Sequence, residues 1–425
     1  MVIREKTEFQ SPTKRELSTT REAGMMEVQV VTGDYQPEIE RLQDIGYTKH
    51  SDNGETGLNN NVFTTTLTKD NQVATVIHMA NTKITYIVFE NDVAVSERMI
   101  YSEEYVAGNE ADAKTTLHML ETYRPGSSFV IQLKNKHFVI CDGGHVEELS
   151  HLLSYLEDLS PNRQKPIIEG WFMTHPHRDH VDILRGFVEN PDYADRIFVD
   201  GIYMDLYDDE LLEHVGVGPV LEVVDMAVKM LKTSEGKATR IYRPHAGQRY
   251  YFSDITVDVM QTMVQVPRNK WYRWKQNLNE MSAWYMFTIE GQKYLNPGDA
   301  DLGAMQEIMS TYDREYLDMD IMAVHHHGVN VHNEFTDYIK VKTLLYPYYG
   351  IDGAFKEGMD WPGAWQASVY RNEYLHNMVE ESLSYGDGTK VLSFPYEVGT
   401  AISLPLRGER YEFTGINKER RIEYK

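Results

Sequence analysis

The sequence predicts an α+β protein with two parts, a small N-terminal α+β unit over residues 1–110 and a larger domain over residues 111–425. Three apolar, strand-like runs separated by short polar turns lie within residues 62–90, whereas strands and helices alternate from residue 129 onward. The length of 425 residues also exceeds that of a typical single domain. Strands followed by helices in two successive halves are compatible with two packed sheets with helices outside.

In the N-terminal unit we expect one helix and a small sheet. Residues 26–32 alternate as a strand does, and residues 36–45 have helical spacing. A loop rich in Gly and Asn at residues 51–61 precedes the three strands of a meander, which are residues 62–67, 73–79 and 84–90. The isolated His50 and His78 predict no chemistry, because a lone histidine is commonly a partly buried structural residue.

The larger domain alternates strands and helices along its length. Its first half is predicted to contain strands at residues 129–133, 137–142, 167–173 and 197–204 and helices at residues 146–158, 181–189, 209–214 and 218–234. Its second half is predicted to contain strands at residues 248–252, 256–262, 283–290, 293–295, 320–324, 341–347, 390–393 and 401–404 and helices at residues 302–310 and 371–383. No internal repeat interrupts this order.

Composition and charge limit the classes of function. With 41% hydrophobic residues, no apolar run of membrane-spanning length and no signal-peptide core at residues 1–6, the chain is expected to be soluble and cytoplasmic and to bind no membrane. The single cysteine, Cys141, excludes an intramolecular disulfide and lies in an apolar strand, so we expect it to be inert. A formal net charge of −23 would repel duplex nucleic acid and favours a small-molecule substrate. The oligomeric state has no sequence signature.

One short motif carries most of the chemical information. It follows the apolar run at residues 167–173, which we interpret as a buried strand, and it places four metal-ligand side chains within six positions: His175, His177, Asp179 and His180. Imidazole and carboxylate suit zinc, iron or manganese, and the first two histidines lie on the same side of an extended chain. The aspartate and the third histidine fall at the start of the following helix, where they could serve a second, adjacent ion.

The order His-x-His-x-Asp-His resembles the signature of the metallo-β-lactamase fold. The resemblance extends over about Ser127 to Leu406 and includes four further landmarks: the strands at 129–133 and 137–144, the segment 294–300 that ends in an aspartate, and the segment 320–328 that ends in histidines. Within that superfamily the chain looks most like the metallo-β-lactamase domain of DNA-internalisation competence proteins and like phosphorylcholine esterases. The first ~100 residues resemble no family that we can name.

The resemblance implies a four-layer αββα metallo-β-lactamase-like sandwich and a centre for one or two divalent metal ions. Zinc is the expected ion, with manganese or iron as alternatives. By resemblance, His175 and His177 hold one ion, Asp179 and His180 hold the other, and Asp299 bridges both.

The last metal histidine is expected from the run at residues 325–327. Counting along the expected strand at residues 320–324, we favour His326 as the ligand, with His327 next and the first histidine of the run least favoured. The histidines that do not bind metal would face the substrate as a proton donor or oxyanion stabiliser. Asp179 and His327 are therefore the expected catalytic residues.

Two features leave alternatives open. Asp142, in Asp-Gly-Gly before a helix, is either a helix cap and turn former or a residue that supports the metal ligands from behind. Many members of the resembled family carry one more metal histidine between the central motif and the bridging aspartate. His245 and His214 are the candidates here, and a solvent-facing role is the default for both.

A basic and aromatic segment at residues 268–275 stands out against the acidic background. We expect this segment to bind substrate, with cations holding a phosphate and a ring stacking on a base or a cationic head group, through Arg268, Lys270, Trp271 and Arg273. An exposed aromatic hairpin or an oligomer contact is the alternative interpretation. The next residues, 279–282, resemble the Asn-Asp-x-Ser segment of the competence proteins.

These features together predict a hydrolase in which a metal-bound hydroxide attacks an electrophilic phosphorus or carbonyl centre. A phosphodiester is the preferred substrate, because the family resemblance and the basic segment both favour it. A lactone or another carboxylic ester is the first alternative. A non-enzymatic binding protein that retains the metal is the second.

Overall fold

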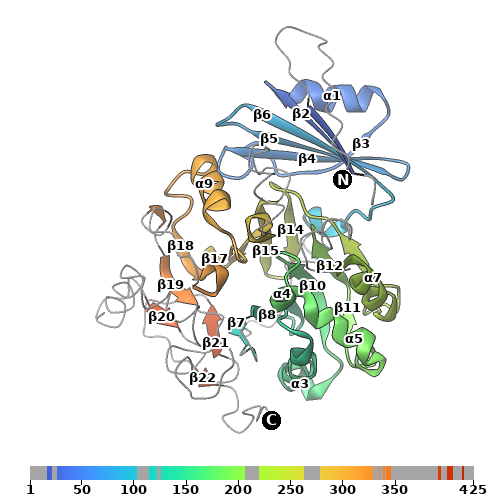
Figure 1. The fold of residues 1–425 in the computed structure, drawn as a ribbon, viewed down its shortest axis with the longest axis vertical. Coiled ribbons are helices and arrows are strands. Elements are labelled where there is room, and N and C mark those ends of the chain that lie inside the picture. Colours follow the sequence, from blue (N-terminus) through green and yellow to red (C-terminus); the bar gives the residue numbers. More distant parts are fainter. Residues whose placement is uncertain are drawn as a thin grey trace.

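The structure is a computed structural model of the chain, drawn in Figure 1. It describes residues 17–21, 26–102, 114–120, 122, 126–205, 220–262, 278–328, 335, 338–339, 341–345, 391–393, 400–404 and 414–415. The predicted helices at residues 209–214 and 371–383 lie outside the described residues. No helix among the described residues combines the length and the apolar character needed to cross a membrane.

A six-stranded antiparallel sheet forms the core of the N-terminal unit, in the order β1-β2-β6-β5-β4-β3. Its strands are Leu17–Arg21 (β1), Met26–Thr32 (β2), Thr48–Asp52 (β3), Val62–Lys69 (β4), Gln72–Met79 (β5) and Ile84–Asn91 (β6). Helix α1, Gln36–Asp44, covers one face and buries Ile39 and Leu42 in a cluster with Val76 and Ile87. The sequence did not predict β3, because this polar edge strand has no buried residue and therefore no apolar alternation.

Two further sheets form the larger domain. The first sheet has the order β13-β12-β10-β9-β8-β7-β21-β22, and β11 also pairs with β10. Its strands are Thr115–Met119 (β7), Ser128–Gln132 (β8), Phe138–Asp142 (β9), Ile167–Met173 (β10), Phe198–Val199 (β11), Gly201–Met204 (β12), Arg240–Tyr242 (β13), Thr400–Leu404 (β21) and Thr414–Gly415 (β22). The second sheet runs in sequence order from β14 to β20, and its strands are Arg249–Phe252, Ile255–Gln261, Trp284–Ile289, Gln292–Asn296, Met319–Ala323, Val341–Leu345 and Val391–Ser393.

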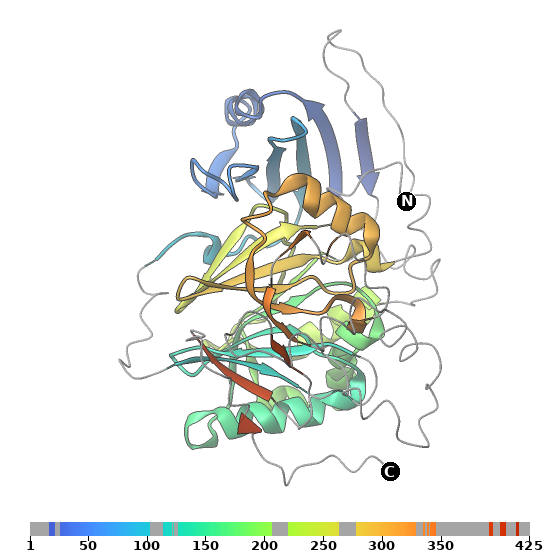
Figure 2. The same cartoon turned by 90° about the vertical axis from the view of Figure 1, so that its left-hand side faces the viewer.

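Helices cover the outer faces of these two sheets. They are Leu149–Leu159 (α3), Arg178–Val181 (α4), Arg185–Glu189 (α5), Val220–Met230 (α7) and Leu302–Thr311 (α9). One apolar cluster lies between the two sheets, a second between the first sheet and α3, α5 and α7, and a third on the outer face of the second sheet with α9. Figure 2 shows these layers one above another, with the N-terminal sheet stacked beyond α9. The predicted four-layer αββα arrangement is confirmed.

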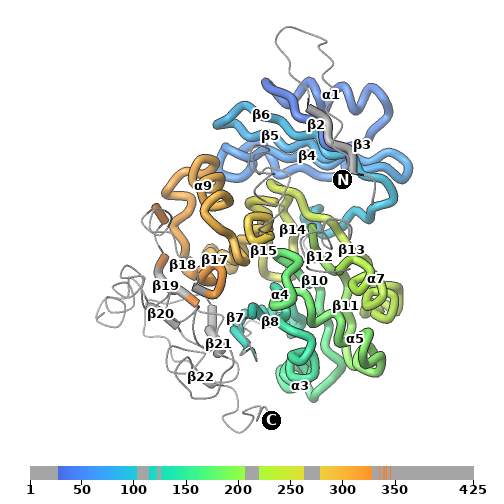
Figure 3. The backbone as a smooth tube through the Cα atoms, viewed as in Figure 1, coloured from blue at the N-terminus to red at the C-terminus, as the bar shows by residue number. Residues whose placement is uncertain are grey.

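Strand β9 shows how the sequence produces the layers. Phe138 and Ile140 face the helices, whereas Val139 and Cys141 face the second sheet, because successive side chains of a strand point to opposite faces. Both faces are therefore buried, which explains the continuous apolar run. β9 runs parallel to β10, so its last residue, Asp142, lies beside the end of that strand. Figure 3 traces other strands of this sheet, among them β8, β10 and β12.

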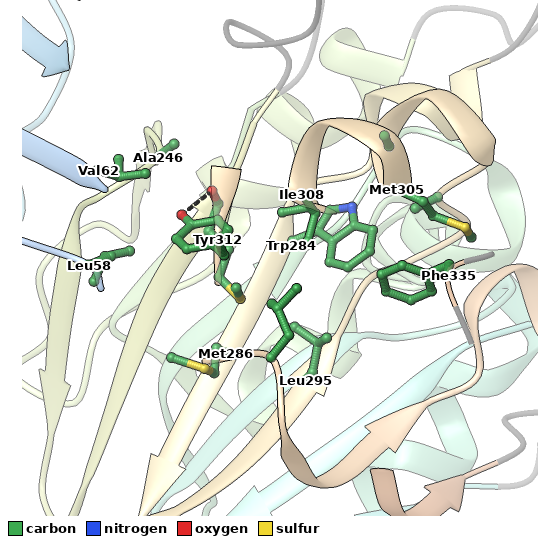
Figure 4. Packing of buried hydrophobic residues seen from close by; sticks show 14 of the residues in the cluster. Leu58, Val62, Ala246, Trp284, Met286, Leu295, Met305, Ile308, Tyr312 and Phe335 are labelled. Atoms are coloured by element: carbon green, nitrogen blue, oxygen red, sulfur yellow. Dashed lines mark hydrogen bonds between the residues drawn. The ribbon is translucent and has the colours of Figure 1, made fainter. Parts of the chain in front are cut away.

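An apolar interface joins the N-terminal sheet to the larger domain. Leu58 and Val62 belong to the same buried cluster as Trp284 of β16 and Tyr312 after α9 (Figure 4). The Tyr312 hydroxyl donates a hydrogen bond of 2.7 Å to the backbone oxygen of Met260, which satisfies its buried polar atom. The N-terminal unit thus covers part of the second sheet's outer face.

Polar contacts fix the position of this interface. The Thr64 hydroxyl donates to the backbone oxygen of Ala246 at 2.7 Å, and Asn53 Nδ2 donates to the backbone oxygen of Gly247 at 2.9 Å. Gly247 has a φ of +85°, and a Cβ there would collide with Thr64 Oγ1, so only glycine allows this close approach.

A buried ion cluster adds to the same interface. Glu90 of β6 accepts hydrogen bonds from Arg243 at 2.8 Å and from His245 at 2.9 Å. Arg243 Nε also lies 3.8 Å from an oxygen of Asp205, which directly follows β12. Because these side chains are shielded from water, their charges can be accommodated only as a cluster.

Candidate metal centre

The candidate centre lies where both sheets of the larger domain end. Its residues lie after β10 and within α4 at the end of the first sheet, and after β17 and β18 at the end of the second. Two hydrogen bonds hold these sheet ends together: the Tyr285 hydroxyl donates to the backbone oxygen of Met173 at 3.1 Å, and Ala283 N donates to that of Thr174 at 2.8 Å. Segments more than 100 residues apart in the sequence thereby meet at one edge.

Four side chains form the first ligand group, which we call the four-ligand group: Asp179, His180, Asp299 and His327. Asp299 Oδ1 lies 3.0 Å from His180 Nε2 and 3.3 Å from His327 Nε2. His327 Nε2 also lies 3.2 Å from Asp179 Oδ2. Asp179 has 21% of its side chain exposed, whereas each of the other three side chains is at most 3% exposed. The group is therefore shielded from solvent except on the side of Asp179.

Three side chains form the second ligand group, which we call the three-ligand group: His175, His177 and Asp299. His175 Nε2 lies 3.0 Å from His177 Nδ1 and 3.8 Å from Asp299 Oδ2. Asp299 therefore presents Oδ1 to one group and Oδ2 to the other. A carboxylate in this position can bridge two neighbouring ions, as the sequence resemblance implied.

The histidine run 325–327 departs from an extended path. His326 and His327 adopt φ values of 47° and 50°, in the left-handed region that few non-glycine residues occupy, and His326 N donates to the backbone oxygen of Gly298 at 3.1 Å. This turn brings His327 into the four-ligand group. Strain of this kind costs about 1–3 kcal/mol and persists mainly at functional sites.

His326 was the preferred ligand in the sequence prediction, but the structure places it outside both ligand groups. Its Nε2 lies 3.8 Å from Asp299 Oδ2 and 3.1 Å from Asn279 Nδ2. His325 packs with its ring edge against Phe335, at 6.2 Å between ring centroids. The prediction counted positions along an extended strand, and the left-handed turn shifts the inward position by one residue.

Asp142 supports the four-ligand group from behind. Its Oδ2 accepts a hydrogen bond from His180 Nδ1 at 2.8 Å, and its Oδ1 accepts from Thr174 N at 2.8 Å. The Thr174 hydroxyl lies within 3.0 Å of both carboxylate oxygens. Because the carboxylate fixes the proton on Nδ1, Nε2 of His180 is the ring atom that remains for a metal.

The charges within the four-ligand group shift one another strongly. Burial alone would lower the pKa of His327, but the carboxylates of Asp299 and Asp179 raise it to about 9. Burial would also lower the pKa of His180, but the carboxylates of Asp299, Asp142 and Asp179 hold it well above its ordinary value. Conversely, His180 and His327 keep the pKa of Asp299 well below its usual range despite burial. These buried carboxylates thus require positive charge beside them.

The imidazoles of the three-ligand group behave differently. Burial lowers the pKa of His175 well below its ordinary value, and the neighbouring His180 adds to that shift. Burial also lowers the pKa of His177. Both rings are therefore neutral near pH 7 and have lone pairs for a metal. Converging imidazole nitrogens and carboxylate oxygens are a donor set that fits zinc and similar divalent ions.

The remaining site predictions concern His245, His214 and the basic segment at residues 268–275. His245 is held by Glu90 at the interface with the N-terminal unit, away from both ligand groups. His214 and the predicted substrate-binding residues fall outside the described part of the chain: Arg268, Lys270, Trp271 and Arg273. The sequence reasoning did not single out Thr174, although its place between the buried strand and the first motif histidine was a usable signal.

No protein family and no curated protein matches the chain. Among solved structures it is similar to a metallo-β-lactamase from Cronobacter sakazakii, with 12% identity, a TM-score of 0.29, and coverage of 46% of this chain and 70% of that one. It is also similar to Zn²⁺-bound PqqB from Methylobacterium extorquens, with 9% identity, a TM-score of 0.31, and coverage of 65% and 87%. A possible metal-dependent hydrolase from Veillonella parvula matches at 10% identity and a TM-score of 0.32, over 69% of this chain and 99% of that one.

Proposed function

We propose that the protein is a metal-dependent hydrolase with a phosphodiester substrate. The observation that carries the proposal is the pair of ligand groups that share Asp299, one oxygen to each group. Two divalent ions bound there would lower the pKa of a water molecule and supply a nucleophile near neutral pH. Zinc suits the nitrogen-rich donor set best, with manganese and iron as alternatives.

The residues of the chain would hold and orient the reacting groups. Asp142 fixes the tautomer of His180, and Ser282 accepts a hydrogen bond from Asp299 N at 3.1 Å, which orients the shared carboxylate. His326 stands beside the two groups with 13% of its side chain exposed, so its ring can reach a bound substrate. The surrounding burial excludes bulk water and strengthens the electrostatic interactions within the site.

The choice of a phosphodiester rests on the basic segment at residues 268–275. The last described residue before it, Thr262, directly follows β15, and the first after it, Leu278, begins a turn that contains Asn279. Asn279 lies 3.1 Å from His326, and β15 pairs with β16 through Gln261 and Trp284 at the same end of the sheet. The described residues that flank the segment therefore lie at the same end of the sheet as Asn279 and His326. Cations of the segment held close to that end would attract an anionic substrate.

A substrate panel with a charge-neutralised variant tests this proposal. Gln at positions 268, 270, 273 and 275 should raise KM for an anionic phosphodiester and weaken its salt dependence, because long-range attraction is screened by salt. The same variant should leave a neutral lactone or ester almost unchanged. A matched control carries Gln at four exposed cations elsewhere, which are Lys49, Arg163, Lys229 and Lys237.

The outcomes separate the competing functions. An equal loss on neutral and anionic substrates, or a loss in the matched control as well, would contradict a steering role for the segment. Turnover of the lactone or ester alone would replace the phosphodiester with that substrate class. Elemental analysis should find up to two zinc, manganese or iron ions per chain, and metal-free protein after reconstitution would reject the hydrolase itself.

A further inference from the structure

We infer that a cleft in the N-terminal unit binds a small organic cation, of the class that carries a primary ammonium group on a flat apolar body. The cleft lies between helix α1, strand β3 and strand β4, and its volume is about 460 Å³. Small-molecule sites commonly have volumes of roughly 300–1,000 Å³. None of the residues that line the cleft belongs to either ligand group, so the inference does not depend on the proposed hydrolase.

The cleft exists because α1 covers only part of its sheet. The helix buries Ile39 and Leu42 in a cluster with side chains of the inner strands, among them Leu67 and Val76. Strand β3 lies at the edge of the sheet and buries no side chain, so no apolar contact draws the helix over it. Figure 1 shows α1 along one face of this sheet. The space between the helix and the β3 edge therefore stays open.

One wall of the cleft is aromatic. Phe63 and His78 stand opposite each other on β4 and β5, and the Tyr35 ring stacks on both, at centroid distances of 5.5 and 4.9 Å. Burial lowers the pKa of His78, so that ring is neutral near pH 7 and does not repel a cation. Tyr35 and Phe63 line the cleft and are partly exposed. A cation within about 6 Å of such a ring is attracted by its π electrons.

The β3 side of the cleft carries net negative charge. Asp52 accepts hydrogen bonds from Lys49 Nζ at 2.7 Å and from Gly54 N at 3.0 Å. The contact with Lys49 lowers the pKa of Asp52, which is therefore ionised near pH 7. Glu55 also lines the cleft and forms no ion pair or hydrogen bond with another described residue. Two carboxylates against one ammonium leave one negative charge unpaired, which favours a cation over an anion.

The same negative charge acts on the aromatic wall. Burial raises the pKa of the Tyr35 hydroxyl, and the charges of Asp34 and Asp52 raise it further. Carboxylates that disfavour a negative charge at this ring favour a positive charge beside it. The ring and the carboxylates are therefore close enough to attract one and the same cation.

A buried hydroxyl group supplies a directional contact. Thr65 lines the cleft and is 6% exposed, and its hydroxyl has no hydrogen-bond partner in the described part of the chain. Its neighbours Thr64 and Thr66 bond to Ala246 and Gln248 of the larger domain, so Thr65 points to the opposite, α1 face of the strand. A hydroxyl oxygen accepts hydrogen bonds from N–H groups. A primary ammonium group is thus favoured over a fully methylated one.

Calorimetric titration of the full chain with phenethylammonium tests the inference. This probe should bind saturably at one site per chain, equally to metal-free and zinc-loaded protein. Neutral phenethyl alcohol and anionic phenylacetate have nearly the same shape, and both should bind about tenfold more weakly or not at all. The inference would be overturned by a lack of saturable phenethylammonium binding, by equal binding of the alcohol, or by binding that requires zinc.

A charge variant and a matched control locate the site. Asp52→Asn combined with Glu55→Gln should weaken phenethylammonium binding about tenfold or more. The control combines Asp44→Asn with Asp70→Asn, which removes two exposed carboxylates of the same unit outside the cleft, and should bind as the unsubstituted protein does. Equal weakening in both would indicate diffuse attraction to an acidic protein and overturn the site. Glu55→Gln alone, which breaks no contact among the described residues, repeats the test should the double variant not fold, and unchanged affinity there would also contradict the inference.

Two further substitutions separate the hydroxyl from the ring. Thr65→Val keeps the side-chain shape, so it should weaken binding of phenethylammonium and leave binding of its trimethylated form unchanged, because that form has no N–H to donate. Tyr35→Leu should weaken binding of both forms, whereas Tyr35→Phe, which keeps the ring, should weaken neither. Equal effects of Thr65→Val on both forms, or unchanged binding in Tyr35→Leu, would place the cation outside this cleft.

Discussion

His180 Nδ1 lies 2.8 Å from Asp142 Oδ2, although the two residues are 38 positions apart in the sequence. Strands β9 and β10 run parallel, so Asp142 at the end of one stands beside the turn that follows the other. Thr174 completes the contact with its backbone nitrogen and its hydroxyl. This arrangement leaves His180 Nε2 directed at Asp299, 3.0 Å away.

Asp142→Asn should therefore weaken metal binding at the four-ligand group. The new amide nitrogen would donate to His180 Nδ1 and move the ring proton to Nε2, which then cannot bind a metal. We expect the affinity of the four-ligand group for a divalent ion to fall about 10–100-fold, as measured by chelator competition. Thr174→Ser is the control, because it keeps the hydroxyl that contacts Asp142. Comparable losses in both variants would contradict the tautomer argument.

Asp179→Asn should reduce hydrolysis by more than ~100-fold, because a direct ligand matters more than a supporting contact. The fold should remain intact, since Asp179 lies in the short helix α4 and adds nothing to the apolar core. Turnover at saturating metal and the midpoint of thermal unfolding provide the two measurements. Asp182→Asn is the matched control from the same turn, where the carboxylate pairs with Arg185 instead. Unchanged turnover in the Asp179 variant would reject its assigned role.

His326→Asn should keep the ion of the four-ligand group, in contrast to His327→Asn. His326 is bonded to the Asn279 side chain and lies 3.8 Å from the shared carboxylate, whereas His327 lies 3.3 Å from that carboxylate and 3.2 Å from Asp179. The comparison needs only the number of tightly bound ions per chain after dialysis. Loss of that ion in the His326 variant would support His326 as the metal ligand, as the sequence favoured.

The sequence could predict those parts of the fold that depend on local patterns. Strand β10 and the ligand motif after it are local features of the sequence. The continuous apolar runs of β9 and β10 indicated strands that are buried on both faces. The layers themselves came from a family resemblance, because periodicity does not determine which sheets pack together. The resemblance also singled out Asp299, which directly follows the Asn-Pro-Gly turn at the end of β17.

What the sequence could not predict depends on backbone turns and long-range pairing. The left-handed conformations of His326 and His327 are held by a hydrogen bond to Gly298, a partner in another loop, and counting along the strand takes no account of this turn. His245 was open between a ligand and a surface residue, and its partner Glu90 lies 155 positions earlier. No local pattern joins such residues.

The ion cluster at the interface gives the last prediction. Burial alone would raise the pKa of Glu90, but His245 and Arg243 lower it from 4.5 to about 2. A carboxylate whose pKa is depressed by folding stabilises the folded state above its unfolded pKa and loses that contribution as the pH falls toward the folded value. For this shift in the pKa of Glu90, the contribution to the free energy of unfolding is roughly 3 kcal/mol. It is present above about pH 4.5 and is lost as the pH falls from there to about 2.

Glu90→Gln should therefore lower the free energy of unfolding at pH 7 by about 3 kcal/mol, because it leaves the buried Arg243 without its charged partner. Urea unfolding of both proteins at pH 7, 5, 4 and 3.5 should show a constant difference down to about pH 5 and a narrowing one below it. Glu235→Gln, which removes a fully exposed carboxylate paired with Lys237, should match the unsubstituted protein at every pH. A difference that stays the same down to pH 3.5 would mean that Glu90 stabilises the interface by packing and not by its charge.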